Sequence, residues 1–178
     1  ALAIKEIIGA PAERSVFVVL PFSSVIFPAL TQPSLRYDPL RDIQAVASLT
    51  SFPLGVVVSA GTGVRTPREL AAWLKANPSK AQFGTAGAGG HNHFLGLQLG
   101  KAVGVESSVV TYKGNAPLIN DLIPGHVPAA VMVAGESLAF VKDGRLNLVG
   151  VLSPRRSPLM PQVPSFAEEG IAIESGEA

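Results

Sequence analysis

The sequence predicts an α/β fold with a largely parallel sheet, and three observations lead to this class. The chain has 178 residues, of which 47% are hydrophobic and 15% charged, with a formal net charge of +1. This balance favours a packed core over disorder. Its 18 glycines and 15 prolines divide it into short apolar runs, whereas average usage would give about 21 such residues. Candidate strands and helices alternate between these breaks, as in folds with a mostly parallel sheet.

The first fifty residues contain two predicted strands. Residues 1–8 resemble the end of an amphipathic helix. The run at residues 16–20, Val-Phe-Val-Val-Leu, is continuous, β-branched and aromatic, which predicts a buried parallel strand. Tyr37-Asp38-Pro39 predicts a turn, because a residue before proline avoids the helical region. A second strand is expected at residues 44–49.

Clearer signals begin with a strand expected at residues 54–59. Thr66-Pro67-Arg68-Glu69 has the spacing of a capping box with proline at the first helical position, and it predicts a helix to about residue 76. Asn115 is the expected N-cap of a later helix, and Ser165-Phe166-Ala167-Glu168 is a second capping box. The remaining expected strands are residues 82–85, 107–112, 127–133 and 146–152, and the remaining helices are residues 93–101, 115–123 and 136–142.

Several classes of protein are excluded by composition. The chain has no cysteine, so disulfide scaffolds, thiolate zinc sites and cysteine nucleophiles are excluded. The near-neutral charge argues against nucleic-acid binding. No apolar run approaches the ~18 residues of a membrane span. Lys5 and Glu6 interrupt the first apolar stretch, unlike a signal peptide. The chain is therefore expected to be a fragment or mature piece of a longer protein, and the earlier removal of a signal peptide stays an open alternative.

A glycine-rich turn at residues 84–90 lies between a predicted strand and a predicted helix. Main-chain amides and the positive end of a helix can hold an anion at such a place. A dinucleotide fingerprint lacks its last glycine here, because Asn92 stands in that position. A P-loop lacks its lysine and hydroxyl residue, because Gly90 and His91 stand there. A general anion cradle remains, against the alternative of a turn without a ligand.

Two further strand ends have polar groups. Tyr112-Lys113-Gly114-Asn115-Ala116-Pro117 forms a second strand–turn–helix junction, which favours an anion or is an ordinary turn with an exposed lysine. Ser23 and Ser24 follow the strand expected at residues 16–20 and offer hydroxyls. Ligands of open α/β sheets bind outside the carboxyl ends of strands. The three ends can therefore converge on a small carboxylate without any arginine.

Metal binding and hydrolysis are not expected. His91 and His93 form a pair, but a catalytic zinc site needs three protein ligands as a rule, and the remaining histidine is His126 in a predicted turn. Gly135-Glu136-Ser137-Leu138-Ala139 is close to a nucleophile elbow. It lacks the final glycine, and no histidine follows Ser137 to act as the base.

Four motifs occur in a fixed order along almost the whole chain. They are Tyr37-Asp38-Pro39-Leu40-Arg41-Asp42, Phe83-Gly84-Thr85-Ala86-Gly87, Tyr112-Lys113-Gly114-Asn115-Ala116-Pro117, and Ser153-Pro154-Arg155-Arg156-Ser157-Pro158 with Pro161-Gln162-Val163-Pro164-Ser165-Phe166-Ala167-Glu168-Glu169-Gly170. With these motifs the chain resembles the Bug-type extracytoplasmic solute receptors of tripartite tricarboxylate transporters, which are periplasmic solute-binding proteins.

The resemblance implies a two-lobed flytrap of the type II periplasmic-binding-protein kind, with mostly parallel sheets and the ligand between the lobes. Residues 1–52 would be part of lobe one, residues 53–170 a near-complete lobe two, and residues 171–178 the start of the return crossing. The crossing between the lobes is expected near residues 50–55. Residues 1–50 would then leave apolar surface uncovered, which a partner chain or a swapped segment is expected to cover.

The resemblance also implies a periplasmic receptor that is not an enzyme and has no cofactor. It would capture a di- or tricarboxylate, an aromatic acid or an acidic amino acid and present it to a membrane permease. The ligand-binding residues carried over by position are Ser23, Ser24, Thr85, Ala86, Gly87, Gly89, Gly90, His91 and Tyr112. Three positions depart from the family: Gly90 replaces a frequent serine, Pro128 a common aspartate and Met132 a polar residue. The alternatives are an α/β enzyme binding a phosphorylated cofactor at residues 84–90 and a sensory or interaction domain.

Overall fold

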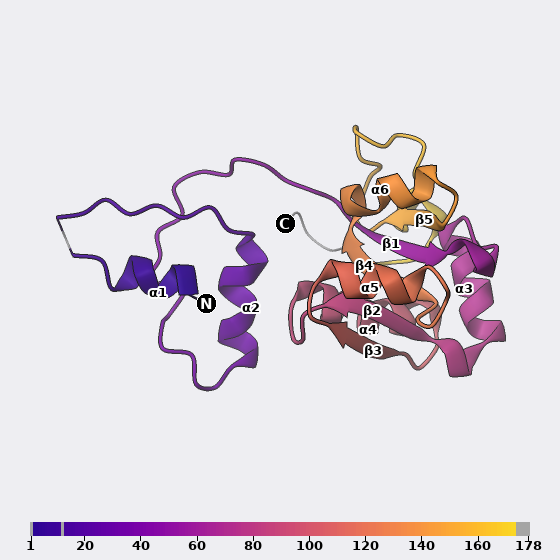
Figure 1. Ribbon diagram of the computed structural model, residues 1–178, viewed down its shortest axis with the longest axis horizontal. Coiled ribbons are helices and arrows are strands. Elements are labelled where there is room, and N and C mark those ends of the chain that lie inside the picture. The colour runs from indigo at the N-terminus through magenta and orange to yellow at the C-terminus, as the bar shows by residue number, and fades with distance from the viewer. Residues whose placement is uncertain (1, 12, 174–178) are drawn as a thin grey trace. The chain divides into compact units, whose positions relative to one another are not determined.

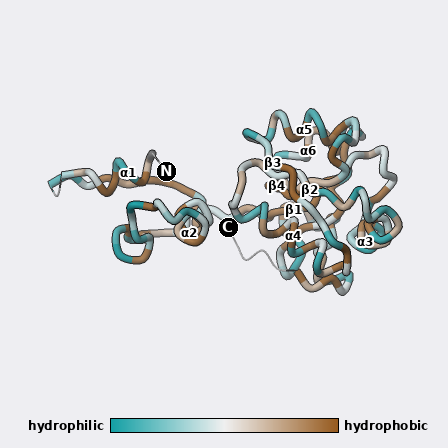
Figure 2. The backbone as a smooth tube through the Cα atoms, turned by 90° about the horizontal axis from the view of Figure 1, so that it is seen from below, coloured by the Kyte–Doolittle hydropathy of each residue, from teal (hydrophilic) through white to brown (hydrophobic). Residues whose placement is uncertain are grey.

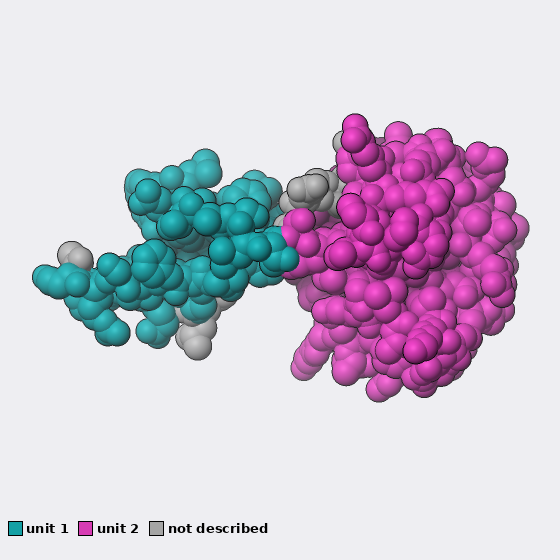
Figure 3. Space-filling view, turned by 90° about the horizontal axis from the view of Figure 1, so that it is seen from above, with its two compact units in different colours: residues 1–50 teal, residues 51–178 magenta. Residues whose placement is uncertain are grey.

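The computed structural model describes residues 2–11 and 13–173. The chain divides into two compact units, residues 1–50 and residues 51–178 (Figures 1 and 3). The first unit contains helix α1 (Leu2–Ile8) and helix α2 (Phe22–Thr31), joined by irregular segments. The second unit contains the sheet and the larger core.

Both strands predicted in the first unit are wrong. Residues 16–20 and 44–49 form no strand, and most of their apolar side chains are exposed, with Phe17 at 75% and Val46 at 74%. A strand needs hydrogen-bonded neighbours to satisfy its backbone, and the described residues of this unit contain no strand with which they could pair. Ser23 and Ser24 therefore lie in the first turn of α2 and not at a strand end.

The described strands of the second unit form one mixed sheet. They are β1 (Leu54–Ser59), β2 (Gln82–Ala86), β3 (Ser108–Tyr112), β4 (Ala129–Val133) and β5 (Leu146–Val151). Their order in the sheet is β3-β2-β4-β1-β5. Strand β2 pairs in parallel with β3 and β4, and β1 pairs antiparallel with β4 and β5. Four of these strands therefore run in one direction, and β1 is reversed.

Helices cover both faces of this sheet (Figure 1). Leucines of α3 (Pro67–Ala76) and α4 (His91–Val103) pack with Val56 and Val58 in one core cluster. Leucines of α5 (Asn115–Leu122) pack with Val57 in a second cluster, against which Phe140 of α6 (Ala134–Lys142) also lies. Alternate residues of a strand point to opposite faces, so β1 is buried along its whole length. Figure 2 shows the hydrophobic residues concentrated along these central strands.

The N-caps of α3 and α5 can be compared with those predicted from the sequence. Thr66 caps α3 as expected, because its hydroxyl accepts a hydrogen bond of 3.2 Å from the Glu69 amide. The expected Asn115 cap is wrong: Gly114 is the N-cap of α5, with a φ of 109°. That left-handed conformation favours glycine, and it places the cap one residue before Asn115. The described residues also include the short 3-10 helices η1 (Ala60–Thr62), η2 (Pro78–Lys80) and η3 (Ala167–Glu169).

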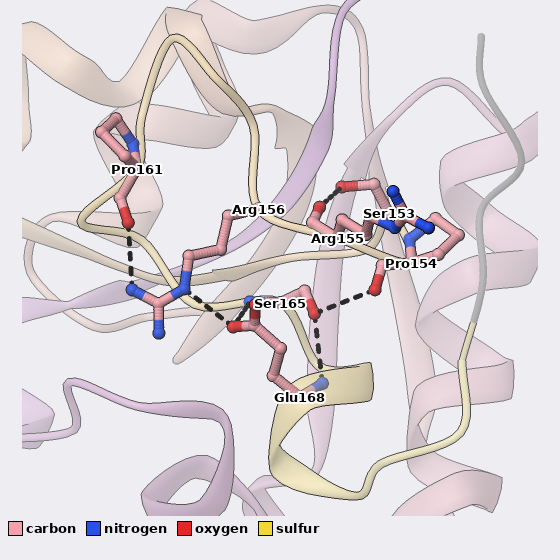
Figure 4. Close-up of polar contacts among 7 residues, drawn as sticks. All are labelled: Ser153, Pro154, Arg155, Arg156, Pro161, Ser165 and Glu168. Carbon is pink, nitrogen blue, oxygen red and sulfur yellow. Dashed lines mark hydrogen bonds and ion pairs between the residues drawn. The ribbon is translucent and has the colours of Figure 1, made fainter.

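The segment after β5 is held by polar contacts around Glu168 (Figure 4). Arg156 Nε donates to Glu168 Oε2 at 2.8 Å, and Arg156 Nη1 donates to the Pro161 carbonyl at 3.0 Å. Glu168 Oε2 also accepts from the Ser165 amide at 3.2 Å, while Ser165 Oγ accepts from the Glu168 amide at 3.1 Å. These are the two reciprocal bonds of the predicted capping box, although the helix continues only as the 3-10 turn η3.

This network predicts that the stability of the folded protein varies with pH through the ionisation of Glu168. The hydrogen bond from Arg156, and then the bond from the Ser165 amide, lower the pKa of Glu168 below its ordinary value of 4.5. A lowered pKa in the folded state means that the carboxylate stabilises the protein above its ordinary pKa, and that this stabilisation is lost as pH falls through the lowered value. We expect Glu168→Gln to flatten the loss of stability between about pH 5 and about pH 3.

The measurement is the urea midpoint of unfolding across that range, for the wild type and for Glu168→Gln. Glu106→Gln is the matched control, because Glu106 is exposed and has no recorded hydrogen bond or ion pair among the described residues. Its acid limb should follow that of the wild type. If the urea midpoint varied with pH in the same way for all three proteins, the loss of stability in acid could not be assigned to Glu168.

Candidate ligand-binding site

Three parallel strands end at the same edge of the sheet, and each is followed by a helix. Strand β2 leads to α4, β3 to α5 and β4 to α6. Because β3, β2 and β4 are neighbours and parallel, their carboxyl ends lie side by side. Ala86 at the end of β2 stands opposite Tyr112 at the end of β3. The starts of three helices thus gather at the edge where open α/β sheets bind ligands.

The glycine loop, residues 86–90, connects β2 to α4 and is tied down at its start. The Gly87 amide donates to the Tyr112 carbonyl at 2.9 Å. Thr85 is fully buried, and its hydroxyl donates to the Gly87 carbonyl at 3.3 Å. Gly87 and Gly89 have φ values of 93° and 66°. Side chains are strained in that left-handed region, so glycine is required at both positions to form the loop.

The rest of the glycine loop presents unused donors. Within the described part of the chain, the amides of Ala88, Gly89 and Gly90 donate no hydrogen bond. Gly90 is the N-cap of α4, and no side chain caps that helix. A Cβ atom added at Gly87 or Gly90 would meet nothing within 4 Å. Unsatisfied amides at the start of a helix form a site for a small anion such as a carboxylate.

At the β3–α5 junction, the main-chain carbonyl of Tyr112 supports the glycine loop. The Tyr112 hydroxyl is turned along α5, where it donates to Asp121 Oδ2 at 3.0 Å. Burial first, and then the bond to Asp121, raise the pKa of Tyr112. The ring also lies against Gly84, 3.4 Å from where a Cβ would stand. Tyr112 therefore supports the glycine loop through its carbonyl, and a ligand contact from its side chain stays a prediction.

The β4–α6 junction brings in a residue that sequence reasoning missed. Glu136, in the first turn of α6, accepts a hydrogen bond from Asn115 Nδ2 at the first turn of α5. The neighbouring Ser137 is buried and donates to the Ala134 carbonyl at 2.8 Å, so its hydroxyl is not presented as a nucleophile. An acidic residue just after a strand that precedes a helix is the sequence signal that could have identified Glu136.

The structure gathers part of the predicted ligand set. Seven of its members lie at or beside the ends of β2 and β3, namely Thr85, Ala86, Gly87, Gly89, Gly90, His91 and Tyr112. The other two, Ser23 and Ser24, belong to α2 in the first unit. Among residues 2–11 and 13–173, no group of three or more His, Cys, Asp or Glu residues is arranged to hold a metal ion. No helix in the same ranges is long and apolar enough to cross a membrane.

A separate hollow of about 390 Å³ lies at the start of α3, lined by Thr66, Arg68, Glu69, Ala72 and Glu169. Its main-chain donor is already occupied, because the Arg68 amide donates to Glu169 Oε2 at 2.8 Å. The helix α3 follows β1, which runs opposite to β2, β3 and β4, so this hollow lies away from the glycine loop. The unused amides therefore favour the glycine loop as the candidate site.

Comparison with known proteins gives consistent matches. A family model described as a tripartite tricarboxylate transporter family receptor matches residues 10–176. Protein BugT of Bordetella pertussis is 30% identical over 138 residues, which cover 78% of this chain and 42% of BugT. The solved structure of a periplasmic transporter has a TM-score of 0.77 at 26% identity and covers 87% of this chain and 52% of that one.

A second solved structure, R. palustris Rpa4515 with adipate, has a TM-score of 0.70 at 26% identity and covers 78% of this chain and 46% of that one. The chain spans less than half the length of the curated relatives that it matches. These matches confirm the resemblance to Bug-type receptors as a partial chain, and they confirm the α/β class of periplasmic binding proteins.

Proposed function

The chain belongs to the receptor family of tripartite tricarboxylate transporters, and from this premise we propose that its protein captures a small carboxylate and delivers it to a membrane permease. The family model describes a receptor, and two similar structures are of a periplasmic binding protein, BugD, and a TctC solute binding protein, which supports the expectation that this protein is not an enzyme. The ligand would be a di- or tricarboxylate, an aromatic acid or an acidic amino acid. The place of action would be the periplasm.

The observation that carries this proposal is the row of unused amides at Ala88, Gly89 and Gly90. A carboxylate accepts several hydrogen bonds at once, and bonds to a charged group contribute about 1.5–3 kcal/mol each. The positive end of α4 adds to this attraction. The presence of adipate in the structure of Rpa4515 supports the same class of ligand.

The two-lobed organisation is also part of the proposal. Residues 1–52 would contribute to lobe one, residues 53–170 would form lobe two, and residues 171–178 would begin the return. Ser23 and Ser24 would offer hydroxyls to the ligand from the first turn of α2. Closure of the lobes would require contacts that the ligand makes only in the closed state.

Exposed apolar side chains in residues 1–50, such as Phe17, Leu40 and Leu49, would be covered by further chain, by a second copy or by a swapped segment. Light scattering after size exclusion tests the two intermolecular options. A well-folded monomer would contradict them.

Isothermal titration calorimetry tests the proposed function on protein expressed from its whole reading frame. The panel is dicarboxylates, tricarboxylates, aromatic acids and acidic amino acids, with nucleotides as the competing class. We expect one carboxylate to bind with a stoichiometry of one. No heat with any carboxylate, together with binding or turnover of a nucleotide, would favour the phosphorylated-cofactor enzyme instead.

A further inference from the structure

Resting on the proposed function, we infer that Glu136 sets the class of ligand. The guest is a zwitterion: its carboxylate meets the amides of the glycine loop, and its protonated amine faces the Glu136 carboxylate. Glu136 thereby selects an amino acid against the dicarboxylate of the same length. It is a specificity-determining residue of the site.

The position of Glu136 supports this role. Its side chain joins Asn115 across the starts of α6 and α5. These helices follow β4 and β3, and β2 lies between those two strands in the sheet. The contact therefore spans the carboxyl end of β2, from which the glycine loop departs. Neighbouring strands lie about 5 Å apart, so a guest of a few carbons can reach from one group to the other.

The charge of Glu136 supports the same role. Glu136 is exposed, and its recorded hydrogen-bond partner is the neutral amide of Asn115. None of the ion pairs found among the described residues includes Glu136, and the nearby exposed Lys113 forms no recorded bond with it. The protein thus places a carboxylate that is in no recorded ion pair at the sheet edge from which the glycine loop departs. A second carboxylate of a ligand would be repelled there, whereas an ammonium group would be attracted.

A purely structural role for Glu136 makes a different prediction. An acidic residue in the first turn of a helix stabilises that helix through the helix dipole. Replacing it would then change stability and leave the choice between ligands unaltered. The ratio of affinities for two ligands that differ only in amine against carboxylate separates the two roles.

The test uses protein from the whole reading frame and matched pairs of ligands in calorimetry. The pairs are β-alanine with succinate, γ-aminobutyrate with glutarate, δ-aminovalerate with adipate, and the p-aminomethyl analogue of terephthalate with terephthalate itself. The variant is Glu136→Gln, which keeps an oxygen acceptor for Asn115 and removes the charge. Glu106→Gln, before the amino end of β3, is the control with the same change of charge.

We expect the wild type to bind the amino member of the best-bound pair more tightly than the dicarboxylate. Glu136→Gln should reduce the ratio of these two affinities about tenfold, the effect expected for the loss of one charge-assisted contact. Glu106→Gln should leave the ratio unchanged. A ratio unaltered by Glu136→Gln, or a wild type that binds carboxylates but no amino member, overturns the inference and leaves the proposed function standing. Failure of every carboxylate to bind removes the proposed function as well.

Discussion

Phe166→Ala is expected to lower the free energy of unfolding by about 3–5 kcal/mol, the usual cost of truncating a fully buried phenylalanine. Phe166 has no exposed surface and belongs to the core cluster on the α3 and α4 face. Its ring lies over Gly150 of β5, where an added Cβ would be only 2.9 Å from the ring atom Cε2. Removing the ring therefore leaves a cavity against β5, which its pairing with β1 holds in the sheet.

Urea denaturation followed by circular dichroism measures this loss. The control is Leu159→Ala, a truncation in the same segment at a side chain that is 84% exposed. Its effect should stay within about 0.5 kcal/mol. A cost below about 1 kcal/mol for Phe166→Ala would contradict the inclusion of the segment after β5 in the core.

Gly90→Pro is expected to weaken binding of the carboxylate ligand about tenfold or more. Proline removes the Gly90 amide, and a hydrogen bond to a charged group contributes about 1.5–3 kcal/mol, where about 1.4 kcal/mol is a factor of ten. The φ of −90° at Gly90 lies near the range of proline. The Gly90 carbonyl, which accepts from the His93 amide at 3.1 Å, is retained.

Gly90→Ala is the matched control for this prediction. Alanine keeps the amide, and its Cβ would meet nothing within 4 Å. We therefore expect calorimetry to show nearly unchanged affinity for Gly90→Ala, and thermal melting to show that both variants are folded. Equal affinities for the wild type and Gly90→Pro would mean that this amide does not contact the ligand.

The second unit could be predicted from sequence because its signals are local. Thr66 and Glu69 define the start of α3 through their own spacing, and the runs that became β1 and β5 consist mostly of apolar residues. The direction of β1 was not predictable, because an antiparallel and a parallel buried strand have the same composition. Residues 16–20 show the opposite limit. Their composition suits a strand, but a strand also needs a partner, which local sequence does not reveal.

The candidate site was predictable where it depends on backbone conformation. Glycines between a strand and a helix indicated the cradle at residues 84–90, and the φ values of Gly87 and Gly89 agree with that reason. The orientation of the Tyr112 hydroxyl depends on Asp121, which lies nine residues further along and reaches it only once α5 is packed. The contact between Asn115 and Glu136 likewise joins two junctions that only the order of strands brings together.

A crystal structure of the whole protein with its bound acid is the most direct measurement of the central claim. We predict that carboxylate oxygens lie within hydrogen-bonding distance, about 2.7–3.2 Å, of the amides of Ala88, Gly89 and Gly90. A carboxylate held instead by an arginine side chain, or bound at a different edge of the sheet, would contradict this claim.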